Sequence, residues 1–161
     1  MIICAYVNNL LYRKISVPNK ISLSDLGYYV LSAFDVDEYY EYYYEKEQLE
    51  YPSNYEIDAY SFLPCTMLYE EFEIHLEIED ESESTCSLIG GRGYGLWLEC
   101  SEFMDLFYES YESFEEYCNS NNIDLNYFPI DLDFDYETCS MMFEENYLMI
   151  KDVYENDGYE G

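Results

Sequence analysis

The stretch LYRKISVPNKISLSDLGYYVLSAFDVDEYYEYYYE, residues 11–45, decides the fold, because it reads as a strand, a capped helix and a second strand. Apolar and polar residues alternate from Leu11 as in a strand, and Pro18 ends the pattern. Ser22 is a good helix N-cap, with Asp25 three residues later in a near capping box. Spacings of three and four residues then predict one apolar helix face: Leu23, Leu26, Val30 and Phe34.

Gly27 lies inside this predicted helix, where glycine costs about 1 kcal/mol relative to alanine. We expect it to let a neighbouring element approach closely. Residues 38–45, EYYEYYYE, predict another strand, because aromatic residues favour strands. A first strand is expected at 1–8, and a loop with a further strand at 48–60. Residues 68–79 alternate as one strand, with Phe72, Ile74, Leu76 and Ile78 inward and Glu71, Glu73, His75, Glu77 and Glu79 outward.

The sequence of the second half of the chain predicts further strands and helices. Residues 85–89 are expected to pair back as a hairpin, and Ser101 to cap a helix with one acidic face. A strand at 130–136 and a last helix at 137–154 follow. The chain therefore predicts a single α+β domain over residues 1–154, with a mixed or antiparallel sheet and two to three packed helices. Residues 155–161 are expected to form a frayed acidic tail.

Charge is the extreme feature of the composition. The chain carries 36 Asp and Glu against 6 Lys and Arg, a formal net charge of −30. Residues 1–34 hold Arg13, Lys14 and Lys20 against a single acid, so nearly all of the negative charge lies beyond them. We expect the basic pair Arg13-Lys14 to contact the chain's own acids. Such a field repels nucleic acid and anionic membrane and attracts basic partners.

Six cysteines are scattered without a C-x-x-C pair, which predicts reduced thiols rather than a disulfide framework. The N-terminal residues lack the pattern of a signal peptide, and no run of about 18 apolar residues predicts a membrane span. Aromatic residues make up 20% of the chain, which argues against disorder. We therefore expect a folded, cytoplasmic protein.

Two segments of the N-terminal stretch resemble the plasmid pRiA4b open-reading-frame-three-like fold family. The strand residues of the match are Tyr12, Arg13, Lys14, Ile15, Val17 and Pro18, and the helix residues are Leu23, Leu26, Val30, Ala33 and Phe34. Residues 72–79 are similar to the family's W-x-H-x-I-x-L-E strand, and residues 90–98 to its G-G-P-x-G-Y-x-x-F-L segment. The resemblance spans about residues 3–108. It implies an α+β domain and little about activity.

The chain departs from the family where the family carries polar side chains. Gly27, Tyr40 and Tyr42 stand near the expected histidines, and Ile74 replaces the strand histidine. His75 is out of phase, on the opposite face of its strand. The C-P-P-x-x-C-G-G pattern is reduced to a cysteine at position 86 and glycines at 90–91. A site built from those groups in relatives would be lost here.

Several motifs suggest chemistry that the surrounding residues do not support. Asp131, Asp133 and Asp135 open like a calcium loop, but Tyr136 and Met142 stand where glycine and glutamate are required, so an acidic strand face is expected. The scattered cysteines do not match a structural zinc site, and His75, the single histidine, offers little for a Cys–His nucleophile. The glycines at 90–93 lack the phosphate-loop pattern, so we expect a tight turn. The sequence predicts no cofactor and no metal.

The acidic surface is what needs explaining, since a small domain stays soluble with a net charge of about 2–8. Adaptation to high salt fits poorly with 22 Tyr, 9 Phe and 6 Cys. Another explanation is that the protein is an enzyme that uses a pair of carboxylates in a cleft. The favoured hypothesis is an inhibitor that imitates DNA and occupies the basic nucleic-acid-binding groove of a host defence nuclease. The composition of the chain resembles that of phage or mobile-element inhibitors of the anti-CRISPR or anti-restriction type. The alternative is a generic acidic interaction module of a mobile element without enzymatic activity.

We expect the partner to be a basic nucleic-acid-binding protein, with no direct contact to nucleic acid or membrane. The residues predicted to contact it are acids on strands and helices with tyrosines beside them. They are Glu41, Glu45, Glu77, Glu79, Asp80, Glu81, Glu83, Glu109, Glu112, Glu116, Tyr39, Tyr40, Tyr42 and Tyr43.

Overall fold

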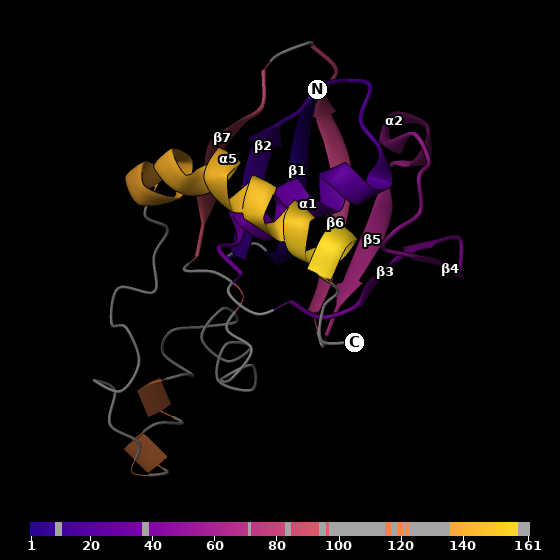
Figure 1. The fold of residues 1–161 in the computed structure, drawn as a ribbon. Coiled ribbons are helices and arrows are strands. Elements are labelled where there is room, and N and C mark those ends of the chain that lie inside the picture. The colour runs from indigo at the N-terminus through magenta and orange to yellow at the C-terminus, as the bar shows by residue number, and fades with distance from the viewer. Residues whose placement is uncertain are drawn as a thin grey trace.

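The computed structural model describes residues 1–8, 11–36, 39–70, 72–82, 85–93, 96, 115–116, 119–120, 122 and 136–157 (Figure 1). The strands are β1 (Ile2–Asn8), β2 (Leu11–Ser16), β3 (Tyr42–Lys46), β4 (Leu49–Pro52), β5 (Cys65–Tyr69), β6 (Phe72–Asp80) and β7 (Ser87–Arg92). The helices are α1 (Leu23–Ala33), α2 (Ala59–Phe62) and α5 (Tyr136–Asp152), which continues as a π-helical turn, Val153–Asp157. The prediction of an α+β fold is confirmed.

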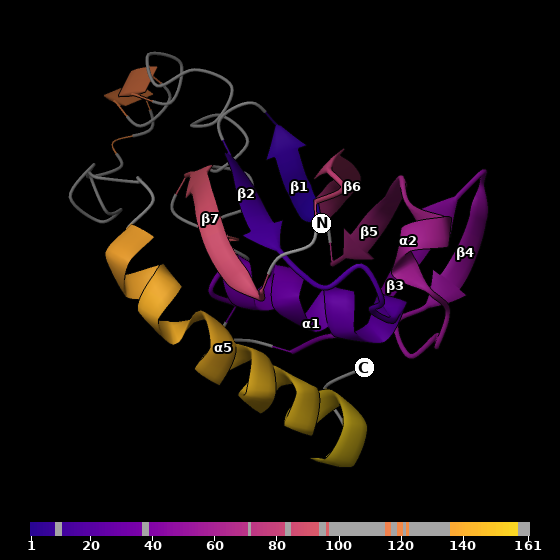
Figure 2. The ribbon, with the colours of Figure 1, turned by 90° about the horizontal axis from the view of Figure 1, so that it is seen from above.

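The seven described strands form one sheet in the order β4-β3-β5-β6-β1-β2-β7, and every pairing between them is antiparallel. β1 and β6 meet at the centre although some 70 residues separate them in the chain. Figure 2 shows α1 and α5 on the same side of this sheet, with α5 as the outermost layer. The core therefore lies between α1 and one face of the sheet.

Strand alternation decides which side chains enter this core. Phe72, Ile74 and Leu76 are buried in β6, as predicted, and Ile78 is half-buried. In β2 the inward positions are Leu11, Arg13 and Ile15. Most of α1 is buried, because the sheet covers one side of it and α5 the other. The Ser22 hydroxyl accepts a hydrogen bond from the backbone N–H of Asp25, which confirms the predicted N-cap.

Gly27 marks the closest approach of α1 to the sheet. The hydroxyls of Tyr42 and Tyr44, from β3, lie where a Cβ atom at this position would be. Tyr44 also donates its hydroxyl hydrogen bond to the carbonyl of Leu23. The expected close approach is therefore made by two tyrosines. Burial raises the pKa of both phenols well above the usual value.

Arg13 is fully buried, and its guanidinium ties the end of α1 to the sheet edge. Its Nε donates to the carbonyl of Ala33 at 2.8 Å, and its Nη1 to the carbonyls of Tyr12 and Arg92 at 3.0 and 2.9 Å. The guanidinium carbon also lies 5.1 Å from the centre of the Phe34 ring. These contacts place Arg13 in the core, whereas Lys14 of the same basic pair makes the expected contact with an acid, Glu79.

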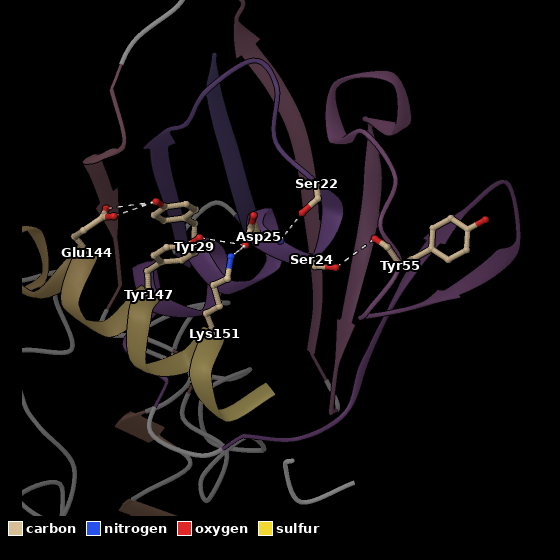
Figure 3. Close-up of polar contacts among 8 residues, drawn as sticks. All are labelled: Ser22, Ser24, Asp25, Tyr29, Tyr55, Glu144, Tyr147 and Lys151. Atoms are coloured by element: carbon tan, nitrogen blue, oxygen red, sulfur yellow. Dashed lines mark hydrogen bonds and ion pairs between the residues drawn. The ribbon is translucent and has the colours of Figure 1, made fainter. Parts of the chain in front are cut away.

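The packing of α5 on α1 combines apolar burial with polar contacts (Figure 3). Phe143, Tyr147 and Ile150 are buried, and the rings of Tyr147 and Tyr29 stack with centroids 3.7 Å apart. Asp25 Oδ1 accepts from the Tyr147 hydroxyl at 3.1 Å and from Lys151 Nζ at 2.9 Å. These hydrogen bonds join residues 122 and 126 positions apart in the chain, so they hold α5 in place on α1.

Several predicted elements differ from the structure. Residues 68–79 form two strands, because the chain turns at Glu70, whose φ of 51° interrupts the extended backbone. The segment after residue 85 does not pair back onto β6: β7 pairs with β2 at the far edge of the sheet. Gly90 to Arg92 lie inside β7, so the predicted tight turn there is wrong. Alternation and glycine content indicate the local conformation of a segment, but they do not indicate which strand it pairs with.

The region around β3 also differs in detail. β3 begins at Tyr42 rather than residue 38, and α2 was not predicted. Glu47 and Gln48 both have positive φ, which makes the two-residue turn that joins β3 to β4. The last helix agrees with its prediction to within a few residues. The helix predicted from Ser101 and the strand at 130–136 fall largely outside the described residues. Of the predicted frayed tail, residues 155–157 lie in the π-helical turn instead, and residues 158–161 lie outside the described residues. In the described part of the chain, no helix has the length and apolar character needed to cross a membrane.

Candidate protein-binding surface

The sheet has a second face that points away from α1 and α5, which we call the outer face. Its side chains alternate with the buried ones along each strand. On β6 they are Glu73, His75, Glu77 and Glu79, which are exposed apart from the half-buried His75. The other strands add Cys4, Tyr6, Tyr12, Lys14, Tyr43, Glu45, Thr66 and Leu68.

Strand register sets these side chains in rows across the sheet. One row runs from Tyr43 through Leu68 to Glu73. A longer row runs through successive partners from β3 to β7: Glu45, Thr66, His75, Tyr6, Tyr12 and Arg92. Side chains directly opposite each other have Cβ atoms about 4.5–5.5 Å apart, so each row is nearly continuous. Acids and aromatic rings are thereby interleaved on one rigid surface.

His75 is held in place at the centre of this face. Its Nδ1 lies 3.1 Å from Thr66 Oγ1, and its ring centroid lies 5.2 Å from that of Tyr6. The Tyr6 hydroxyl donates to Glu77 Oε2 at 3.4 Å. Partial burial raises the pKa of the Tyr6 phenol, and the Glu77 carboxylate adds to the shift. Tyr6 therefore remains a neutral donor beside its acid.

The next row pairs a cation with the acids. Lys14 Nζ lies 3.0 Å from Glu79 Oε1, and both side chains are partly exposed to solvent. Burial raises the pKa of the neighbouring Cys4 thiol, and the negative charge of Glu79 raises it further. A nucleophilic cysteine needs the opposite shift, because the thiolate is the reactive form. The surroundings of Cys4 hold it as a thiol.

The acids of the described residues stay at the surface. All of those whose side-chain exposure the structure describes are exposed, apart from Asp25 and Glu45, which are half-buried. Described ion pairs join Lys14 to Glu79 and Lys151 to Asp25. With 6 Lys and Arg against 36 acids in the whole chain, internal pairing leaves most carboxylates unneutralised.

The structure gathers part of the predicted contact set on the outer face. Glu45, Glu77, Glu79 and Tyr43 lie there. Asp80 ends β6, and its carboxylate accepts from the Ser82 backbone N–H at 2.8 Å. Hydrogen bonds from the Ser82 side chain and then from this backbone N–H lower the pKa of Asp80. The remaining described acids of the set, Glu41, Glu81 and Glu116, are exposed elsewhere, and Glu83, Glu109 and Glu112 lie outside the described residues.

The predicted contact tyrosines other than Tyr43 do not lie on the outer face. Tyr42 is fully buried against α1, so the prediction that it contacts a partner is wrong. Tyr39 and Tyr40 are half-buried and pack against the core. In their place the structure adds Tyr6, Tyr12 and Glu73 to the outer face. The alternation along residues 2–8 and 11–16 could have assigned Tyr6 and Tyr12 to one face of their strands. The order of the strands was needed to show that this face continues that of β6.

A surface cavity of about 710 Å³ lies at the N-terminal end of α1. Ile21 and Ile57 supply its apolar lining, and Glu56, Asp58 and Glu81 supply carboxylates with Lys20 among them. The Tyr60 hydroxyl donates to Glu81 Oε1 at 3.1 Å. Across the described residues, no group of three or more His, Cys, Asp or Glu side chains is arranged to hold a metal ion.

Comparison of the chain with known protein families, curated proteins and solved structures finds no match. The resemblance to the pRiA4b family therefore rests on the quoted motifs and stays a prediction.

Proposed function

We propose that this protein inhibits a nucleic-acid-handling enzyme by occupying its basic binding groove, as an imitation of DNA. The proposed target is a host defence nuclease, of the CRISPR-effector or restriction type, in the cytoplasm. The resemblance of the composition to phage and mobile-element inhibitors supports this choice of target. Binding alone accounts for the inhibition, without catalysis by this chain.

The outer face carries the proposal. Successive outward residues of a strand are about 7 Å apart, so Glu77 and Glu79 are neighbours on this face of β6, and Glu73 lies about 14 Å from Glu77 with His75 between them. Arginine forks bind carboxylates with the same paired hydrogen bonds that they make to phosphates. Because the carboxylates stand on a hydrogen-bonded sheet, their relative positions are set before the partner arrives, which lowers the entropy lost on binding.

The tyrosines of the outer face supply contact area in addition to the charge of the carboxylates. Tyr6, Tyr12 and Tyr43 offer broad rings with few rotatable bonds, which suits them to contact arginine and lysine side chains. Tyr and Arg are also the residue types enriched at binding hot spots. The unneutralised charge of the whole chain would speed the encounter with a basic groove. Together these features support tight, salt-sensitive binding.

The experiment captures partners from a lysate of the cells that carry the protein, with and without competing duplex DNA. We expect a basic nucleic-acid-binding protein that DNA displaces. With that protein purified, the affinity should fall steeply between about 50 and 200 mM salt. Affinity that barely changes over this range, or a partner that DNA does not displace, would overturn the imitation of DNA and leave a generic acidic module.

A pair of matched variants locates the contact. Glu73→Gln with Glu77→Gln removes two charges from the outer face, and we expect at least tenfold weaker binding. Glu47→Gln with Glu70→Gln removes the same charge from two exposed residues in turns between strands, outside the strand positions of the outer face, and should change affinity less than threefold. Equal effects from the two pairs would mean that net charge, not the outer face, decides binding.

A further inference from the structure

α5 exposes large apolar side chains on the side of the molecule opposite the outer face. Met141 is 75% exposed, Leu148 58% and Met149 52%. Soluble proteins rarely cluster large apolar residues at the surface without a use for them. These three lie on a helix whose other side is already packed on α1 through Phe143 and Tyr147.

The exposed residues follow the helical period. Glu137, Met141, Glu145, Leu148 and Asp152 are spaced by three or four residues, so they form one stripe along the outward side, which we call the α5 stripe. All five are exposed, whereas Phe143, Tyr147 and Ile150 of the same helix are buried. Acidic and apolar residues alternate along the stripe, and Met149 lies beside it. Figure 2 shows α5 as the outermost layer, so the stripe faces away from the sheet.

The charges of α5 divide in the same way. Lys151, the cation of this helix, is directed to Asp25 on α1. Glu144 is also on the α1 side, where its carboxylate accepts from the Tyr29 hydroxyl at 3.2 Å. Glu137, Glu145 and Asp152 remain on the outward side with Met141 and Leu148. The stripe therefore combines negative charge with apolar contact area and carries no cation.

We propose that the α5 stripe docks into an apolar groove edged by Lys and Arg side chains on a partner protein. A helix presented to a groove is bound through apolar anchors on one side, and Met141 and Leu148 are seven residues, or about two turns, apart. The acids between and beside them match a basic groove edge, and methionine adapts to uneven apolar surfaces. A second copy of this chain is a poor occupant, because it would bring like charges together. This surface is separate from the outer face, so it extends the proposed function.

The test places a photoreactive diazirine amino acid at position 141, 148 or 49 of the full chain, one at a time. Leu49, in β4, is the control, since it is 58% exposed like Leu148. After irradiation in lysate of the cells that carry the protein, positions 141 and 148 should cross-link to the same protein. The cross-linked peptides should contain apolar residues flanked by Lys or Arg.

Binding by the purified partner then gives the second measurement. Met141→Gln with Leu148→Gln should weaken it at least tenfold, whereas Leu49→Gln should change it less than twofold, with all thermal midpoints within about 2 °C. Cross-links to a second copy, cross-links no stronger than at position 49, or unchanged affinity would overturn the proposal. Loss of binding through the Glu73 and Glu77 variants, with the α5 stripe variant unaffected, would overturn the stripe alone and keep the proposed function.

Discussion

Gly27 is the residue at which α1 and β3 come closest, and its missing side chain makes room for two phenol hydroxyls. A methyl group there would overlap the hydroxyls of Tyr42 and Tyr44. Overpacking a core typically costs about 1–3 kcal/mol, while the better helix propensity of alanine returns about 1 kcal/mol. Because both hydroxyls belong to buried rings with little room to move, we expect the upper end of the resulting range: Gly27→Ala should lower the free energy of unfolding by up to about 2 kcal/mol, measured by urea denaturation.

Gly90 supplies the matched control for this prediction. A Cβ atom at that position would meet no atom within 4 Å. Gly90→Ala should therefore leave the free energy of unfolding within about 0.5 kcal/mol of the original. If Gly27→Ala proved as stable as Gly90→Ala, the tyrosines would have room to move, and the close approach would not constrain the core.

At the scale of elements, the docking of α5 depends on a polar contact as well as on burial. Asp25 receives both the Tyr147 hydroxyl and the Lys151 ammonium. Because these side chains are partly solvent-exposed, screening reduces the value of the pair, and we expect Asp25→Ala to cost about 1 kcal/mol. Hydrogen exchange should show faster opening of α5 amides with little change in β1 and β6.

Glu145→Ala is the control for the α5 prediction. It removes an acid from the same helix, but from the exposed outward side. Its effect on unfolding should stay within about 0.5 kcal/mol, and α5 exchange should be unchanged. Equal exchange rates in the two variants would show that ring stacking and apolar burial hold α5 without help from Asp25.

At the scale of the whole molecule, buried tyrosines make stability depend on alkaline pH. Burial is the main cause that raises the pKa of Tyr28, Tyr29, Tyr42 and Tyr44 above the usual value of about 10. The pKa of Lys151 is raised by its hydrogen bond to Asp25. Each group therefore keeps its proton in the folded chain at a pH where the unfolded chain has lost it. Their contribution is present below about pH 10 and is lost as the pH rises.

We expect the thermal midpoint to fall steeply between about pH 9.5 and 11.5. Phenolate absorbance should rise in two stages, first from exposed tyrosines and then, together with the loss of circular dichroism, from the buried ones. Smooth ionisation of all tyrosines while the circular dichroism stays native would contradict the burial of this group.

Much of the local structure could be predicted from short-range patterns. Ser22 caps α1, residues 72–78 alternate as expected, and the apolar period places the last helix, because each depends on neighbours within a few positions. The large negative charge is likewise a property of composition. The candidate surface was only half predictable: Glu45 and Glu77 were identified, but Tyr42 was assigned to the wrong face.

Short-range patterns were enough to predict the helix cap, the charge and the two-sided character of β2 and β6. Which side is covered depends on where α1 and α5 pack, so it follows only from the folded chain. The tertiary structure also decided that β7 pairs with β2, that Tyr6 stands beside His75, and that Arg13 serves the core. Pairing between distant strands depends on contacts across the whole chain, and alternation along one strand carries no information about its neighbour.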